Sequence, residues 1–490
     1  MQTRSRISLL LALLLLTTAA LAHIGTTDVY CEGDAGPYHL LVTVRPPKVI
    51  PGLAEVDVQV MSGSARSIKL IPILTTGKDD SLAPTIDEFM EQVPGDKTSF
   101  VGQVWLMAPG SWKLQTEVDG EQGKSSFNLP VPAYAQTTVP MQRSLGIFLL
   151  GFMGFLALSA ISIAGASVGE SLVPAGVAPS SADIRRGRMA MVVATLLVTG
   201  IITLGGLWWR RQALRAENKV YSAPQFTASL EPSGRLSLHV GKNSIFIHSD
   251  EEWSMGLMPD HGHLMHLFLL RVPNMDRFYH LHPEPAADGS FNIALPAISA
   301  GHYRVFADIV RKSGFAETMT TNIDLPDIAG QPLTGDDSSS DATSFQAPVQ
   351  NGAVTAPLPD GSRLVWERDS APPSISKLTL FRFRVEDGDG KPVSDLEPYM
   401  GMMGHAEFVN SDQSVFAHVH PAGSVSMAAL ELMQPNSGDT MPHSAHDHMM
   451  AMPATVSFPF GFPKPGSYRL FVQIKRHGQV ETGVFDTQVM

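Results

Sequence analysis

Cysteine is almost absent from this sequence. With one cysteine among 490 residues no intramolecular disulfide can form, so each domain must be held together by its packed core. Charged residues are also scarce, at 17% against a usual share of about 25%, and this shortage favours membrane segments over one very large core. The net charge is -12 and lysine and arginine form no stripe, so we expect no nucleic-acid partner.

Hydrophobic runs divide the chain. Residues 1–22 have the basic start, apolar run and AxA-like end of a secretory signal peptide, with an uncleaved anchor as the alternative. Two charge-free runs, 145–166 and 189–209, approach the roughly 20 residues that a bilayer requires. The sequence therefore predicts two transmembrane helices joined by a short cytoplasmic loop, 167–188, with the soluble segments on the extracytoplasmic (periplasmic) side of the cell membrane.

Some arginines support this membrane orientation and others oppose it. Arg185, Arg186 and Arg188 in the loop fit the cytoplasmic side, whereas Arg210 and Arg211 after the second run would lie outside, against the positive-inside tendency. The three soluble segments resemble one another, so one compartment for all of them is the simpler interpretation.

That resemblance is an internal repeat. Each soluble segment contains a turn, an aromatic residue and an alternating strand, as in KPGSYRLFVQIKRHG from Lys464. Such alternation, broken by glycine and proline turns, is typical of an antiparallel β-sandwich. We expect a mainly β chain with three immunoglobulin-like antiparallel sandwiches at 23–138, 223–328 and 373–490, plus the two transmembrane α-helices. Residues 329–372 are polar and lack periodicity, which predicts a flexible linker.

Two segments, FYHLHPE and FAHVHPA, place histidines one residue apart before a proline. Alternate side chains of a strand share a face, so both members of each pair point the same way. A further histidine begins the strand that the repeat places beside each pair, about 4.8 Å away, so three imidazoles can meet around one ion. The candidate metal ligands are His266, His280 and His282 in the second sandwich and His405, His418 and His420 in the third.

Methionines accompany both sets, in EWSMGLM from Glu252 and PYMGMM from Pro398. Thioether sulfur is a soft ligand that binds chiefly Cu(I), so a copper ion, as Cu(I) or Cu(II), is the expected cofactor. The additional candidate ligands are Met255, Met258, Met402, Met403 and His263. In the alternative interpretation the histidines are hydrogen-bonded strand ends and the methionines fill the core. The histidine- and methionine-rich loop 431–454 is either a metal-scavenging tract or a disordered insert.

Three further residues lie near the N-terminus of the first sandwich. After cleavage, the amine and imidazole of His23 would together chelate Cu(II), and His39 would supply another nitrogen. The thiol of Cys31 is either a metal ligand or a small buried hydrophobe. The first sandwich lacks the HxHP pair, so no repeat supports a site there.

Enzyme interpretations fail on particular residues. His280, His282 and Glu284 partly fit a cupin metal site, but Ala422 replaces the glutamate in the later copy. HGHLMH is similar to the HxHxDH of metallo-hydrolases, except that Met265 stands where the acid is needed. A P-loop, and a GxGxxG before a helix, are absent from the sequence. We therefore expect no enzymatic activity.

The later domains resemble YtkA-like and FixH-like exported β-sandwich modules. The resemblance lies in FRFRVEDGDGKPV from Phe381, MGMMGH from Met400 and PGSYRL from Pro465. It implies an immunoglobulin-like fold and, as in the copper-resistance sandwiches, copper handling in some members.

The sequence thus predicts a membrane-anchored, extracytoplasmic metal-binding protein that sequesters copper or confers copper resistance. It would deliver the metal to a membrane partner such as a copper transporter or an oxidase-assembly protein, and its linker would let two sites reach different donors. The alternative is a non-catalytic scaffold whose sandwiches bind partners and whose histidines are structural. A sensor signalling through the hairpin is a third interpretation, although the inner loop carries no output domain.

Overall fold

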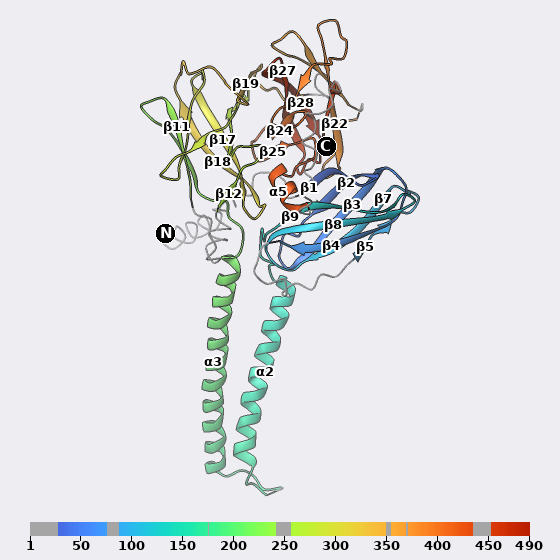
Figure 1. Cartoon of the computed structure of the whole chain (residues 1–490). Coiled ribbons are helices and arrows are strands. Elements are labelled where there is room, and N and C mark those ends of the chain that lie inside the picture. Colours follow the sequence, from blue (N-terminus) through green and yellow to red (C-terminus); the bar gives the residue numbers. More distant parts are fainter. Residues whose placement is uncertain are drawn as a thin grey trace. The chain divides into compact units, whose positions relative to one another are not determined.

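The computed structural model describes residues 28–75, 88–174, 176–241, 256–348, 354–368, 371–434 and 452–490. The signal peptide, His23 and Met255 lie outside these residues. The chain divides into two compact units, one of residues 1–134 with 222–490 and one of residues 135–221. The first unit is built from antiparallel sheets and the second from two long apolar helices, which confirms the expected fold class (Figure 1).

The N-terminal module packs the sheet β1-β2-β3-β7-β6 and the sheet β5-β4-β8-β9 around one core. In β3, GLAEVDVQVMS, Ala54, Val56 and Val58 are buried while Glu55 and Gln59 are exposed. This period of two is that of a sheet with one face on the core. The strands are β1 (Val29–Ala35), β2 (Tyr38–Arg45), β3 (Gly52–Ser62), β4 (Ala65–Leu74), β5 (Glu88–Phe89), β6 (Glu91–Gln92), β7 (Ser99–Leu106), β8 (Gly110–Gly120) and β9 (Gly123–Ala133).

The middle module has a small sheet, β10-β11-β16-β15, and a larger one, β12-β17-β13-β14-β19, in which β18 also pairs with β17. A second apolar core is shared by the two sheets. The strands are β10 (Phe226–Leu230), β11 (Arg235–Val240), β12 (Leu257–Met258), β13 (His266–Arg271), β14 (Arg277–Leu281), β15 (Glu284–Pro285), β16 (Phe291–Ala294), β17 (Gly301–Arg311), β18 (Ala316–Leu325) and β19 (Ser338–Asp341).

The C-terminal module repeats this plan with the sheets β20-β21-β22-β26 and β23-β27-β24-β25, the latter extended by β28 beside β27. Its core is rich in aromatic rings. The elements are β20 (Thr355–Pro357), β21 (Arg363–Glu367), β22 (Thr379–Glu386), β23 (Leu396–Glu397), β24 (His405–Asn410), β25 (Phe416–Val419), the helix α5 (Met427–Met433), β26 (Thr455–Phe460), β27 (Gly466–Arg476) and β28 (Gln479–Val489).

The predicted flexible linker, 329–372, contains ordered strands. The strand β19 pairs with β14 of the middle module, whereas β20 and β21 begin the C-terminal module. The polar composition predicted no order because serine and aspartate bury little apolar surface. Pairing with an open strand edge, however, satisfies backbone donors and acceptors without apolar side chains. Residues 349–353 and 369–370 lie outside the described part of the chain.

The middle and C-terminal modules meet through the outer faces of their larger sheets. In β13, Leu267 and Leu269 point into the module's own core, whereas Phe268 and Leu270 point outward. The outward residues join a fourth apolar cluster that contains residues of both modules. Its ring stacks are Phe278 on Phe471 at 4.2 Å and Phe306 on Phe416 at 4.1 Å between centroids. A strand that is apolar on both faces is typical of a sheet covered on both sides.

The N- and C-terminal modules also share buried residues. Tyr30 of β1 belongs to the C-terminal core, while Val425 and Leu430, beside and within α5, belong to the N-terminal core. Gly423 passes so close to β1 that an added Cβ would lie 1.9 Å from the carbonyl oxygen of Tyr30. Figure 1 shows α5 against β1 and β9. The sequence predicted three separate sandwiches, and this exchange of core residues joins two of them.

Part of the predicted loop 431–454 is therefore ordered. Its first residues, Glu431–Met433, complete α5, which begins after the N-cap Ser426. Met452 packs against the C-terminal core. Residues 435–451, with His443, His446 and His448, lie outside the described residues, so neither interpretation of the tract is tested.

Cys31 is fully buried in the N-terminal core, as expected for a small hydrophobe. Burial raises the pKa of its thiol to about 12, so it is protonated at neutral pH. We expect no reaction of the native full-length protein with a thiol reagent such as DTNB over minutes, and one equivalent of reaction in denaturant. Stoichiometric labelling of the native chain would contradict this burial.

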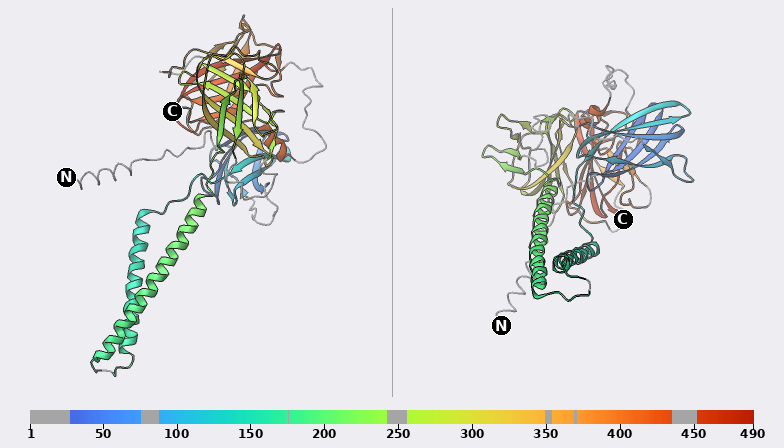
Figure 2. Two further views of the ribbon diagram at one scale, coloured as in Figure 1. Left: turned by 90° about the vertical axis from the view of Figure 1, so that its left-hand side faces the viewer. Right: turned by 90° about the horizontal axis from the view of Figure 1, so that it is seen from below.

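The second unit is a helical hairpin of α2 (Arg143–Glu170) and α3 (Ser181–Glu217), both long and apolar enough to cross a membrane. The two helices run antiparallel in Figure 2. The connection is shorter than the predicted loop 167–188, because a capping box of Ser180 and Asp183 starts α3 early and places the loop arginines in its first turns. Glycines at the helix contact, Gly165, Gly169 and Gly187, allow close backbone approach.

Candidate metal centre

The histidines gather beside the apolar cluster between the middle and C-terminal modules. The period of two that directs Phe268 and Phe416 outward also directs the histidines at the other ends of the same strands outward. Two groups have ring nitrogens close enough to hold one ion each, with all ligand atoms of a group within 4.8 Å of one another. Trio A is His266, His280 and His282, and trio B is His261, His405 and His420.

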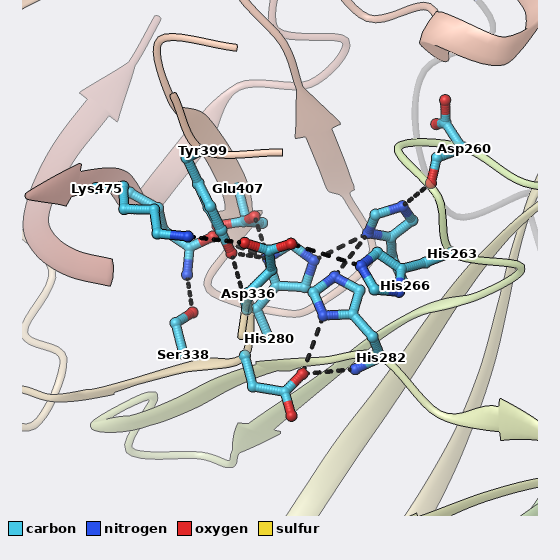
Figure 3. Close-up of polar contacts among 12 residues, drawn as sticks. Asp260, His263, His266, His280, His282, Asp336, Ser338, Tyr399, Glu407 and Lys475 are labelled. Carbon is cyan, nitrogen blue, oxygen red and sulfur yellow. Dashed lines mark hydrogen bonds and ion pairs between the residues drawn. The ribbon is translucent and has the colours of Figure 1, made fainter. Parts of the chain in front are cut away.

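Trio A has the composition that the sequence predicts. The β13–β14 pairing sets Phe268 opposite His280, so the histidines of the two strands lie on one face. The Nδ1 atom of His266 lies 3.1 Å from Nε2 of His280 and 3.2 Å from Nε2 of His282 (Figure 3). Nitrogens bound about 2.0 Å from a tetrahedral ion would be about 3.3 Å apart, so this spacing already suits one cation.

The outer nitrogens of trio A fix where its protons are. Each one faces an oxygen that can only accept a hydrogen bond, so each outer nitrogen carries the proton and each inner nitrogen keeps its lone pair. The contacts are His266 Nε2 to the carbonyl of Asp260 at 3.2 Å, His280 Nδ1 to Gln473 Oε1 at 2.9 Å and His282 Nδ1 to Asp337 Oδ1 at 2.9 Å. The Tyr399 hydroxyl also lies 3.3 Å from Nδ1 of His280, but it donates its own proton to the carbonyl of Asp336 at 2.9 Å. Three lone pairs therefore point at one another with no proton between them, an arrangement that a cation stabilises.

Trio B differs from the predicted set, because His261 of the middle module takes the place of His418. The Nδ1 atom of His420 donates to the carbonyl of Val425 at 2.9 Å, which leaves its Nε2 lone pair free. Among the described residues, this Nε2, the Nε2 of His261 and both nitrogens of His405 are buried without a hydrogen-bond partner. Unpaired buried imidazole nitrogens are costly, and a metal ion would satisfy them.

His261 is not among the predicted ligands, because the sequence repeat sets EWSMGLM from Glu252, rather than DHGHLMH from Asp260, beside PYMGMM from Pro398. The backbone of Asp260 exchanges two hydrogen bonds with His263, and that of Tyr399 does the same with Met402. The structural equivalents are therefore DHGHLMH and YMGMMGH, in which His261 corresponds to a methionine. Both turns have a non-glycine residue and then glycine at positive φ, His261 at 53° in the first turn. The x-Gly pair before each strand was the sequence feature that could have revealed this.

His418 lies between the two trios rather than in one. Its Nδ1 atom is 3.3 Å from Oδ2 of Asp308 in the middle module. Its ring centroid lies 5.3 Å from those of His266 and His405 and 4.5 Å from that of His420. The two predicted sites are thus one continuous group of rings across a module interface, because the interface brings the two outer faces together.

His263 and the methionines occupy the surroundings of the trios. The ring of His263 stacks on His282 at 3.9 Å and its Nε2 lies 3.7 Å from a carboxylate oxygen of Asp336. Met403 packs against the C-terminal core, and the backbones of Met402 and Met258 pair with Tyr399 and Val310. These are contacts of turn and core residues, so a ligand role for the methionines stays a prediction.

Burial keeps the histidines neutral. It lowers the pKa of His261 to about 4, with a further contribution from the nearby His420. Burial is also the main reason that the pKa values of other histidines lie well below 6.5, namely His266, His280, His405 and His418. A neutral imidazole is the form that binds a metal, so the trios are ready for a cation at neutral pH.

Two carboxyl groups lie close by, Glu407, which is fully buried, and Asp308, which is partly buried. Neither oxygen of Glu407 has a hydrogen-bond partner within the described residues, and one of them lies 3.8 Å from Nδ1 of His280. Burial, and then the neighbouring Asp308, raise the pKa of Glu407 well above its usual range. Burial raises the pKa of Asp308 to about 7. Burial thus favours the neutral, protonated form of Glu407 over its carboxylate.

The N-terminal candidate His39 is already engaged. Its Nδ1 atom lies 2.7 Å from Asp34 and its Nε2 atom lies 2.8 Å from Glu32, both carboxylates. Two such partners stabilise the imidazolium and raise the pKa of His39, although burial opposes them. A metal would have to displace both carboxylates.

The comparisons with known proteins do not name an activity. Residues 359–490, most of the C-terminal module, match a family described as a domain of unknown function (DUF8832). The matched family is not a YtkA-like or FixH-like family, so the resemblance of the later domains to those modules stays a prediction. No curated protein matches the chain.

Solved structures show weak likeness only. Escherichia coli alpha-2-macroglobulin activated by porcine elastase is 9% identical with a TM-score of 0.17, over 92% of this chain and 30% of that chain, so this protein spans under a third of its length. A membrane-anchored protein from Corynebacterium diphtheriae is 9% identical with a TM-score of 0.16, over 94% of each chain. Likenesses this low say nothing about the function of this chain.

Proposed function

We propose that this protein is a membrane-anchored, extracytoplasmic binder of transition-metal ions that holds one cation in trio A and one in trio B. The observation that carries the proposal is the direction of the lone pairs in trio A. Asp260, Gln473 and Asp337 hold the outer nitrogens as donors, so the inner nitrogens have nothing to bind except a cation.

Copper is the metal we propose, with Zn²⁺ as its closest competitor. Imidazole nitrogen suits both ions, and a three-nitrogen set accommodates copper in either oxidation state. The buried position of the trios fits sequestration, because bound metal would be shielded from solvent and from other ligands. Delivery to a membrane partner, a copper transporter or an oxidase-assembly protein, is the role that a membrane anchor would add.

The proposed topology places both helices across the membrane and all three modules outside. The length and apolar character of α2 and α3 support a membrane hairpin. The expected signal peptide and the common β plan of the modules support a shared extracytoplasmic compartment. Protease protection of a tagged inner loop in sealed vesicles, with digestion of the modules from outside, checks this topology.

The metal test uses the full-length protein purified in detergent and stripped with a chelator. We expect two equivalents of Cu²⁺ or Zn²⁺ bound more tightly than about 10 μM by calorimetry. His280→Ala with His282→Ala should remove one equivalent by disabling trio A. His405→Ala with His420→Ala should remove the other. His302→Ala is the matched control, because His302 is half-exposed and paired with Asp324 away from both trios.

Three results would count against the proposal. They are binding weaker than about 10 μM in the wild type, equal stoichiometry in the paired variants, and loss of metal in the His302→Ala control. If both paired variants bind as the wild type does, the metal sits elsewhere in the chain. A wild type that binds no metal leaves the scaffold interpretation, for which the buried aromatic interface would be sufficient.

A further inference from the structure

A cavity of about 140 Å³ reaches the histidines from the junction of the three modules. All three modules contribute to its wall. The lining includes Pro130 and Tyr134 of the N-terminal module, Asp260 and Asp308 of the middle module, and His418 and His420 of the C-terminal module. Phe416 of the apolar cluster also lines this cavity, but the rings of that cluster, such as Phe268, offer a cation no ligand. The cavity therefore reaches one ligand of each trio, His266 of trio A and His420 of trio B.

His418 and Asp308 form a polar pair in the cavity wall, beside His266 and His420, which also line it. The side chain of His418 is only 5% exposed, and its Nε2 atom has no hydrogen-bond partner among the described residues. One oxygen of Asp308, Oδ1, also lacks a partner in that part of the chain. A buried imidazole and a partly buried carboxyl group whose side chain is 20% exposed, each with an unused acceptor, together form a two-ligand set for a transition-metal cation.

The position of His418 gives it contact with both trios. Its ring is adjacent to His266 and His280 of trio A, at 5.3 and 5.5 Å between centroids. Its ring is also adjacent to His405 and His420 of trio B, at 5.3 and 4.5 Å between centroids. Direct contact with members of both groups suits a residue that exchanges a ligand with either one.

We propose that His418 and Asp308 form a transfer site, through which a transition-metal cation passes from the cavity into trio A and trio B. This inference rests on the proposed function. A bare cation is strongly disfavoured in a low-dielectric interior, so it must gain one protein ligand before it loses another. His280 and His405 are completely buried, and the cation reaches them by handover from His418.

If the transfer site exists, its loss should slow metal loading without changing the number of ions bound at equilibrium. His418→Gln and Asp308→Asn in the full-length protein should load Cu²⁺ or Zn²⁺ about tenfold more slowly in stopped-flow competition with a chelating dye. Final stoichiometry should stay at two ions, with equilibrium affinity changed less than the rate. The matched control is His302→Gln with Asp324→Asn, a His–Asp pair of the same kind that lies on the solvent side of β17 and β18.

The possible outcomes distinguish the transfer site from the proposed metal binding by trios A and B. Loading at the wild-type rate by both variants would overturn the transfer site while leaving the trios intact. Loss of one ion in His418→Gln would make His418 a resident ligand, which also overturns it. Failure of the wild type to bind any metal would instead remove the proposed function. If His418→Gln does not fold, Asp308→Asn alone decides, because it preserves shape and removes only the charge.

Discussion

Metal-free protein is expected to lose stability steeply once the pH falls below about 6.5, the ordinary pKa of histidine in an unfolded chain. Above that pH the histidines are neutral in both states and contribute no pH dependence. Below it, histidines bind protons in the unfolded chain but stay neutral in the folded protein. Each such histidine then lowers the free energy of unfolding by up to about 1.4 kcal/mol per pH unit. The histidines with lowered pKa are His261, His263, His266, His280, His405, His418 and His420.

The two carboxyl groups beside the histidines oppose this trend. Because the pKa values of Asp308 and Glu407 are raised in the folded protein, their contribution is fully present below the unfolded pKa and is lost as the pH rises through the folded one. Between pH 6.5 and 5.5 they therefore gain stability while the histidines lose it. The seven histidines outnumber the two carboxyl groups, so we expect a net loss of several kcal/mol over that unit of pH.

Urea unfolding of the full-length protein in detergent, with a chelator present, checks this expectation between pH 7.5 and 5.5. His405→Leu should reduce the pH dependence, because it removes one of the groups that resists protonation. His302→Ala should not, since that histidine lies outside the buried group. Saturating Zn²⁺ should move the loss to lower pH, because bound metal competes with protons for the same lone pairs. A urea midpoint that stays constant from pH 7.5 to 5.5 would contradict this expectation. It would mean that water reaches the histidines in the folded protein, so that they protonate there as they do in the unfolded chain.

Trio A could be predicted from the sequence because every step was local. The HxH pair shares a face by the period of two, and the repeat placed the strand of His266 beside it. Trio B could not, since His261 belongs to another module and reaches His405 only across an interface. The sequence did carry part of that information. Phe268 and Leu270 alternate with core leucines in β13, so both faces of the strand had to be covered, but nothing in the pattern names the covering module.

The same limit applies to the linker. A flexible connection between 329 and 372 was expected to let two sites meet different donors, yet β19 pairs with the edge of β14 and Asp337 beside it holds His282. Composition measures how much apolar surface a segment can bury. It does not measure whether a neighbouring strand leaves its edge open for backbone pairing.

Arg469→Ala is expected to destabilise the module interface by about 3–5 kcal/mol, as for removal of one partner of a buried ion pair. Arg469 is 2% exposed and forms two bonds with Asp486, at 2.7 and 2.8 Å. Its Nη1 atom also donates to the carbonyls of Met275 and Thr343, both at 2.8 Å, outside its own module. The substitution leaves a carboxylate and two carbonyls without these donors.

Arg469→Ala is also expected to change the metal affinities of the two trios to different extents. The ligands of trio A all come from the middle module, whereas trio B combines His261 of that module with His405 and His420 of the other. A looser interface should therefore weaken the ion in trio B more than the ion in trio A. Arg384→Ala removes a half-exposed guanidinium from Glu367 and from Glu386, which keeps its second partner Arg363, so it should cost about 1 kcal/mol and leave both ions in place. Calorimetric titration of the full-length variants checks this order. Equal weakening of both ions by Arg469→Ala would show that trio A also depends on the interface, through the bond from His280 to Gln473.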